Sequence, residues 1–191
     1  MKVIGINGSA RKDGNTAVLI KQVFAGLEKA GIEVEMIQLA GKQIKGCASC
    51  FKCMENANKK CVNDSDFFNE CYAKVLAADG LVLGSPVYFS DMSAEMKAFI
   101  DRTGFVSMAN GALLKRKVGV AVAAARRAGA VHTVDSMNHL FFISQMIVPG
   151  SNYWNLGLGM GPGEVEKDEE GLETMRILGE NMAWLMGKTN S

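Results

Sequence analysis

The chain has 191 residues, 48% of them hydrophobic and 21% charged, with a formal net charge of +1. This length suits one domain with a substantial core, and we expect a single domain over residues 1–191. The near-neutral charge argues against a nucleic-acid binder, and no apolar stretch reaches the roughly 20 residues needed to cross a bilayer. Because no secretory leader is recognisable, we expect a cytoplasmic protein with no membrane or nucleic-acid partner.

Strand and helix patterns alternate from the first residues onward. A short apolar run at residues 3–7 predicts a buried strand, and an apolar stripe over 16–30 predicts a helix. Residues 34–39 predict a second strand. Residues 40–64 are rich in Gly, Lys, Asn and Cys, and interrupt the alternation. We therefore expect a cysteine-containing insertion after strand two.

The alternation resumes after the insertion. A helix is expected from Asp64 or Ser65 to about residue 78, with Cys71 facing the core, and Ser93 is expected to cap the next helix. The remaining predictions are strands at 81–83, 118–125 and 146–148, helices at 93–105, 134–145 and 169–186, and a Gly-rich loop at 150–163. Five strands alternating with helices predict a doubly wound parallel sheet, whose ligands bind beyond the carboxyl ends of the strands.

The turn after the first strand has the residues of a phosphate site. A helix N-terminus offers unpaired N–H groups and the positive end of the helix dipole to a dianion. Ser9, Asn15 and Thr16 add side-chain donors, and Arg11 adds a guanidinium that matches phosphate oxygens. An ordinary capped turn with Asn15 as the N-cap is the alternative. Neither a Walker A motif nor a dinucleotide fingerprint is present, so a mononucleotide is favoured.

Two further segments follow this loop in a familiar order. The chain carries Gly8-Ser9-x-Arg11-x-x-Gly14-Asn15-Thr16, then Ser85-Pro86-Val87-Tyr88-Phe89 and Met96-Lys97-x-Phe99-Ile100-Asp101-Arg102. These segments resemble the phosphate loop and the second signature of the NADPH-dependent FMN reductase branch of the flavodoxin-like superfamily. The resemblance spans residues 3 to about 150. It implies a flavodoxin-like, five-stranded doubly wound parallel sheet that binds FMN.

The resemblance also implies which residues contact FMN. Pro86 would hold the backbone N–H groups that follow it against the ring edge, and Tyr88 or Phe89 would cover a ring face. Relatives usually have paired glycines after the fourth strand, where this chain has alanines. The predicted FMN site is Ser9, Arg11, Asn15, Thr16, Pro86, Val87, Tyr88, Phe89, Ala125 and Arg127. No catalytic acid or base is expected, because the flavin carries the chemistry.

Four cysteines are concentrated in the insertion. Cys47, Cys50 and Cys53 are separated by two residues each, and Cys61 follows after seven more. Such gaps let neighbouring thiolates converge on one metal centre. The run resembles that of the iron–sulfur flavoproteins, which implies a 4Fe-4S cluster on these cysteines. Zinc, or thiols without a metal, are the alternatives.

The resemblance implies an FMN-dependent oxidoreductase that passes electrons from a ferredoxin-like donor, through the cluster and FMN, to a small oxidant. A cluster-free NAD(P)H-dependent FMN, quinone or azo reductase is the alternative. A flavin- or phosphate-binding redox regulator without turnover is a third possibility. A homodimer or homotetramer is expected, since in relatives a second subunit completes the flavin site.

Overall fold

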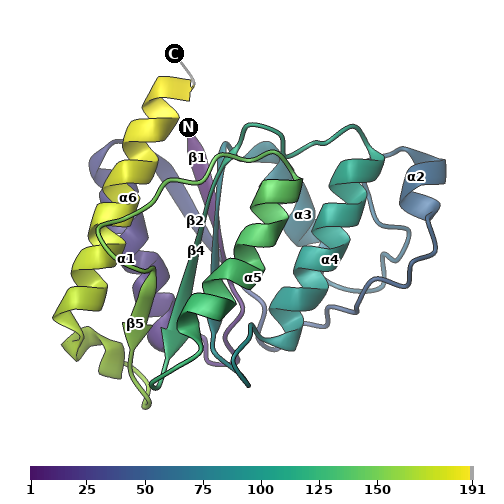
Figure 1. The fold of residues 1–191 in the computed structure, drawn as a ribbon. Coiled ribbons are helices and arrows are strands. Elements are labelled where there is room, and N and C mark those ends of the chain that lie inside the picture. The colour runs from purple at the N-terminus through teal and green to yellow at the C-terminus, as the bar shows by residue number, and fades with distance from the viewer. Residues whose placement is uncertain (190–191) are drawn as a thin grey trace.

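The computed structural model describes residues 1–189, in which five parallel strands form one sheet between two helical layers (Figure 1). The strands are β1 (Lys2–Asn7), β2 (Glu33–Gln38), β3 (Gly80–Pro86), β4 (Val118–Ala125) and β5 (Leu156–Leu158). Their order is β2-β1-β3-β4-β5, with every neighbouring pair parallel. This is the flavodoxin-like order, and it confirms the predicted fold class.

The helices cover both faces of the sheet. In Figure 1, α1 and α6 lie on one side, and α3, α4 and α5 on the other. Side chains alternate along β1, so Val3 packs among α1 and α6 residues while Ile4 and Ile6 pack among α3 and α4 residues. The bounds are α1 (Asn15–Lys29), α2 (Lys52–Asn56), α3 (Phe68–Ala77), α4 (Ala94–Ala109), α5 (Ala130–Ile143), the 3₁₀ helix η1 (Glu164–Lys167) and α6 (Glu169–Thr189).

The fifth strand was predicted wrongly. It was expected at 146–148, but β5 lies at Leu156–Leu158, inside the segment expected to be a loop. Of the predicted strand, Ile147 forms only an isolated bridge to Val118. The glycines of this segment led to the prediction of a loop, but Gly157 is in a strand and allows close packing. A Cβ at this position would lie 2.6 Å from side-chain atoms of Leu19 and Val165.

Helix boundaries differ from the predictions in the insertion and in α5. Helix α3 begins at Phe68, later than the expected Asp64 or Ser65, and α5 begins at Ala130, earlier than expected. The short helix α2 was not predicted. The expected cap of α4 is confirmed, since Ser93 accepts a hydrogen bond from the Met96 N–H. Cys71 is buried in the core, also as predicted.

None of the helices within residues 1–189 combines the length and the apolar character that a membrane span requires.

Helices α1 and α6 approach each other closely at two glycines. A Cβ on Gly26 would lie 2.8 Å from the backbone nitrogen of Glu180. A Cβ on Gly179 would collide with the carbonyl oxygen of Val23. Because these neighbours are backbone atoms, they cannot rotate away. The crossing therefore fixes the position of α1, whose first residues lie at the carboxyl edge of the sheet.

Replacing Gly179 with alanine should destabilise the protein. The added methyl group overpacks the crossing, and we expect a loss of about 1–3 kcal/mol in the free energy of unfolding. Urea unfolding followed by circular dichroism measures it. Gly187→Ala is the matched control in the same helix, where a Cβ meets nothing within 4 Å. That variant should be unchanged or gain up to about 1 kcal/mol. Equal midpoints for the two variants would contradict the packing constraint.

Candidate functional site

The loops after β1, β3, β4 and β5 enclose a pocket of about 190 Å³, which we call the carboxyl-edge pocket. The loops that line it follow the ends of the strand arrows, at the lower edge of the sheet in Figure 1. Its lining is Ser9, Arg11, Asn15, Thr16, Pro86, Val87, Tyr88, Ala124, Arg126, Gly159 and Met160. The structure thus brings together the predicted phosphate-loop residues and Pro86 to Tyr88. Parallel strands direct their carboxyl ends to one edge, which is why distant segments meet here.

The phosphate loop folds around the Ser9 side chain. Ser9 Oγ accepts a hydrogen bond from the Arg11 N–H at 3.1 Å. The first hydrogen bonds of α1 run from the Ala17 and Val18 N–H groups to Gly14 O, at 2.9 and 3.2 Å. The N–H groups of Asn15 and Thr16 therefore precede the intrahelical ladder. Such groups, with the helix dipole behind them, suit an anion.

Asn15 connects the phosphate loop to the loop after β5. Its Nδ2 donates to Gly159 O at 2.9 Å, and its Oδ1 accepts from the Val165 N–H at 3.3 Å. The alternative in which Asn15 caps α1 is wrong, because Gly14 is the N-cap and no side chain caps the helix. A Cβ on Gly159 would lie 2.6 Å from Val165 N and 2.8 Å from Asn15 Nδ2. Glycine is therefore required at 159 for this contact.

Arg126, Gly159 and Met160 line the pocket although they were not predicted. Arg11 Nη1 donates to Met160 O at 3.4 Å, so the Gly-rich loop forms one wall. Recognising Leu156–Leu158 as a strand would have identified this loop, because it then follows a strand at the carboxyl edge. Nothing in the sequence indicated that Arg126, and not its neighbour Arg127, lines the pocket.

Ala125, Arg127 and Phe89 lie outside the lining of the pocket. Ala125 packs in a small cluster with Ala123 and Ala130, whereas Ala124 lines the pocket. Because side chains alternate along β4, Ala124 lines the pocket in place of the predicted Ala125. Arg127 is exposed at the surface beside the pocket. Roles of Ala125, Arg127 and Phe89 toward FMN stay predictions.

The segment after Pro86 forms a tight turn with its aromatics outward. The Tyr88 N–H donates to Asp91 O at 2.8 Å and the Val87 N–H to Ala124 O at 2.9 Å. These two N–H groups are engaged within the protein, which corrects the expectation that they face a ring. Phe89 and Ser90 adopt φ of +48° and +67°, which directs Phe89 into solvent. The turn thus presents exposed aromatic surface at the rim of the pocket.

The four insertion cysteines border a second cavity, of about 90 Å³, which we call the cysteine cavity. Phe51, Val62, Arg102, Phe105 and Val106 also line it. Within residues 1–189, no group of three or more His, Cys, Asp or Glu side chains is arranged to hold a single metal ion. A 4Fe-4S cluster is larger than a single metal ion, and its four thiolate ligands are spread around it. Four cysteines that border one cavity are therefore a donor set that fits such a cluster.

The backbone between the cysteines is unusual. Ser49, Phe51, Ala57 and Lys59 have φ between +45° and +61°, a region that L-residues seldom adopt. Burial, and to a lesser degree the neighbouring Cys61 and Cys47 thiols, raises the pKa of the Cys53 thiol. The positive φ angles mean that the backbone of this segment is held in a conformation that its residue types do not favour.

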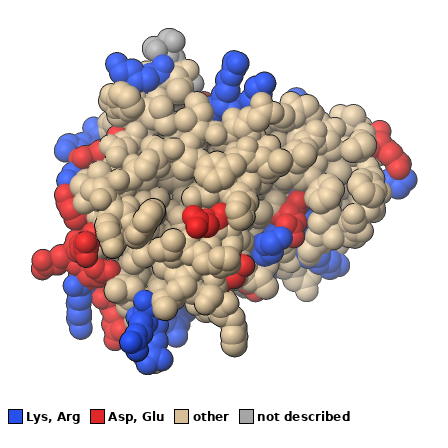
Figure 2. Space-filling model, viewed as in Figure 1, with Lys and Arg blue, Asp and Glu red and all other residues tan. Residues whose placement is uncertain are grey.

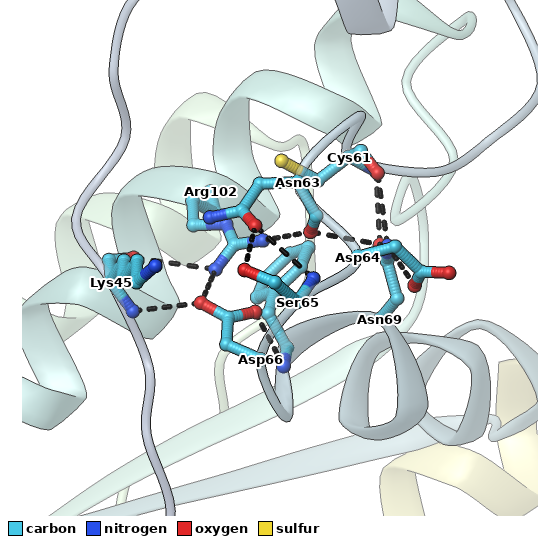
Figure 3. Close-up of polar contacts among 9 residues, drawn as sticks. Lys45, Cys61, Asn63, Asp64, Ser65, Asp66, Asn69 and Arg102 are labelled. Atoms are coloured by element: carbon cyan, nitrogen blue, oxygen red, sulfur yellow. Dashed lines mark hydrogen bonds and ion pairs between the residues drawn. The ribbon is translucent and has the colours of Figure 1, made fainter.

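A buried ion pair closes this segment at both ends (Figure 3). Arg102 Nη1 lies 2.5 Å from Asp66 Oδ2, and the two side chains are 1% and 0% exposed. Arg102 also donates to Lys45 O at 3.3 Å and Asn63 O at 2.9 Å, and the Lys45 N–H donates to Asp66 at 2.8 Å. Burial alone would raise the pKa of Asp66, but the hydrogen bonds from Arg102, Lys45 and Phe68 outweigh it and lower the pKa.

A larger apolar groove lies beside the cysteine cavity, between α2, α4 and α5. Its volume is about 590 Å³, and its lining includes Phe105, Met108 and Ile143, which are 44%, 56% and 62% exposed. Figure 2 shows that the face over α4 and α5 is covered mainly by uncharged side chains. An apolar face of this kind is typical of a surface that another molecule covers.

Residues 1–161 match the family described as NADPH-dependent FMN reductase. Over 190 residues the chain is 40% identical to an iron-sulfur flavoprotein of Methanocaldococcus jannaschii, covering 96% of each protein. It is 33% identical over 177 residues to an iron-sulfur flavoprotein of Methanosarcina thermophila, covering 92% of this chain and 90% of the relative. A flavodoxin from the domain Archaea has the same fold, with a TM-score of 0.64 at 17% identity over 100% of both chains. The chain therefore belongs to the NADPH-dependent FMN reductase family and, within it, to the iron–sulfur flavoproteins, and it is an FMN-dependent oxidoreductase.

Proposed function

We propose that this protein passes electrons from a ferredoxin-like donor to a small oxidant such as oxygen, peroxide or a quinone. It does so with FMN in the carboxyl-edge pocket and a 4Fe-4S cluster on Cys47, Cys50, Cys53 and Cys61. The observation that carries the proposal is that all four cysteines border one cavity. The two relatives named above are called iron-sulfur flavoproteins. A reducing cytoplasm, where thiols stay available as ligands, is the compartment that suits it.

The chain's own residues would hold FMN at two places. Ser9, Arg11 and Thr16, with the first N–H groups of α1, would bind the phosphate. Pro86 and Tyr88 would border the ring, and Tyr88 and Phe89 offer exposed aromatic surface to it. When bound, FMN supplies one- and two-electron chemistry, and a 4Fe-4S cluster supplies single electrons. The protein's part is to bind both groups and hold them in place.

The surface around the cysteines suits an acidic electron donor. Lys45, Lys59 and Lys60 are exposed on the segment that carries the cysteines. Lysines at such a site raise the encounter rate with a negatively charged partner. Ferredoxin-like carriers of acidic surface are the partners that this proposal names.

A second copy of the chain is the proposed occupant of the apolar groove, giving a homodimer or homotetramer. The groove is lined by apolar residues such as Phe105 and Met108 and lies next to the cysteine cavity. Its position beside the proposed metal centre would let a second subunit shield that centre from solvent.

The second candidate is a cluster-free reductase that takes hydride from NAD(P)H. One observation favours it: the family that residues 1–161 match is described as NADPH-dependent FMN reductase. In this case the four thiols would be reduced, or would oxidise together, without a metal.

Metal and sulfide content discriminates the two candidates. Protein purified without oxygen should contain about four irons and four acid-labile sulfides per FMN. Cys50→Ala should lose the iron and keep FMN, because Cys50 borders the cysteine cavity and not the carboxyl-edge pocket. Cys71→Ala is the matched control, since Cys71 is a buried core residue. Flavin without iron, together with rapid reduction by NADPH, would favour the cluster-free reductase instead.

Gly159→Ala should weaken FMN binding. The added Cβ displaces Asn15 and the loop after β5, which we expect to cost about 1–3 kcal/mol of binding free energy and hence roughly 5- to 150-fold in affinity. Titrating FMN into the apoprotein while following flavin fluorescence gives the dissociation constants. Gly150→Ala is the control, because a Cβ at that loop position meets nothing within 4 Å. Unchanged affinity in Gly159→Ala would remove the Gly-rich loop from the FMN site.

A further inference from the structure

The guanidinium of Arg102 connects two points of the chain that are distant in sequence, and we call this set of contacts the clip. Nη1 bonds Lys45 O and Asp66, and Nη2 bonds Asn63 O, so a single side chain holds the backbone on both sides of the cysteines (Figure 3). Asp66 in turn accepts the Lys45 N–H. Only the short helix α2 lies between these points, so no sheet ladder fixes the segment.

Stability alone does not account for this arrangement. Desolvating an arginine and an aspartate costs much of what their attraction returns, so a buried pair is weak evidence for stabilisation. A guanidinium instead fixes the relative positions of its acceptors, because its N–H groups point in fixed directions. The Phe68 ring packs against it, with the guanidinium carbon 4.1 Å from the ring centroid. Arg102 therefore has one orientation, fixed by Asp66, two carbonyls and Phe68.

These contacts do not use every N–H donor of Arg102. Its Nε is buried and has no hydrogen-bond partner among the described residues. Arg102 lines the cysteine cavity, where the side chains of Cys47, Cys50, Cys53 and Cys61 are the sulfur acceptors. A buried donor without a partner is costly and marks the place of a missing acceptor.

We propose that Arg102 is the positioning residue of the cysteine segment: it clips residues 45 and 63 together and offers its Nε–H to a sulfur acceptor in the cysteine cavity. The proposal rests on the proposed function only for the identity of that acceptor as part of a 4Fe-4S centre. The clip itself consists of protein contacts and exists in the metal-free chain. Arg102 acts here through the segment that it holds and through a single hydrogen bond, and it transfers neither an electron nor a proton.

The clip is tested on the metal-free full-length chain by hydrogen–deuterium exchange. In Arg102→Lys, one ammonium cannot reach both carbonyls and Asp66, so peptides covering residues 45–63 should exchange about tenfold faster or more. Peptides of β3 and β4 should exchange as in the wild type. Arg176→Lys is the matched control, since Arg176 lies on the surface of α6 and pairs with Glu173 and Glu180. Wild-type exchange at 45–63 in Arg102→Lys would overturn the proposal.

If Arg102→Lys speeds exchange in the sheet as well, Asp66→Asn takes its place. That variant keeps the arginine and removes the charge that orients it. Acceleration confined to 45–63 supports the clip. Uniform acceleration in both variants overturns it, because the pair would then stabilise the core as a whole.

The sulfur contact has a separate readout. In protein reconstituted with iron and sulfide, Arg102→Lys should have a more negative cluster reduction potential than the wild type and Arg176→Lys, because an N–H donor to sulfur is lost while the charge is kept. An unchanged potential overturns the sulfur contact. If even the wild type holds no iron, the sulfur contact fails with the proposed cluster, whereas faster exchange at 45–63 in Arg102→Lys still supports the clip.

Discussion

The phosphate loop is held from both sides by the strands that flank β1. On one side, Asn7 Nδ2 donates to Gln38 Oε1 and Gln38 Nε2 donates to Ser9 O, each at 2.6 Å. On the other, the Gly8 N–H donates to Gly84 O at 2.8 Å. These contacts require β1 to lie between β2 and β3, which is the switch point of the strand order. The pocket exists because β1 is held at its carboxyl end by both of its neighbouring strands.

Helix α4 connects this loop to the cysteine segment. At its start, Ser93 Oγ donates to Gly8 O at 2.7 Å. Arg102 lies nine residues further on, about 14 Å along the helix axis. After its end, Asn110 donates to Cys53 O at 3.2 Å and accepts from the Lys59 N–H at 2.9 Å. One rigid element thus touches the phosphate loop, the buried ion pair and the backbone of the cysteine segment, so the spacing of the two cavities is set by a helix.

The two cavities are built on different principles. The carboxyl-edge pocket draws its shape from strands and a helix N-terminus, where backbone geometry is already fixed. The cysteine cavity lies in a segment with little regular structure, and side-chain contacts from Arg102, Asp66 and Asn110 hold its backbone. A segment held by a few side chains can be changed by single substitutions, whereas the pocket changes only when the packing of the sheet does.

The sequence by itself determined the fold class, the phosphate loop after the first strand and the grouping of the four cysteines. Those features are local: alternating apolar runs, a Ser-Arg-Asn-Thr turn and close cysteine spacing are visible within a short window. Tertiary structure alone decided the strand that completes the sheet, the Gly159–Asn15 contact and the pairing of Arg102 with Asp66. Each of these depends on residues far apart in the chain. A glycine in a sequence can indicate a turn or a close contact, and an arginine a surface charge or a buried pair, and only the residues around it in the folded structure decide between them.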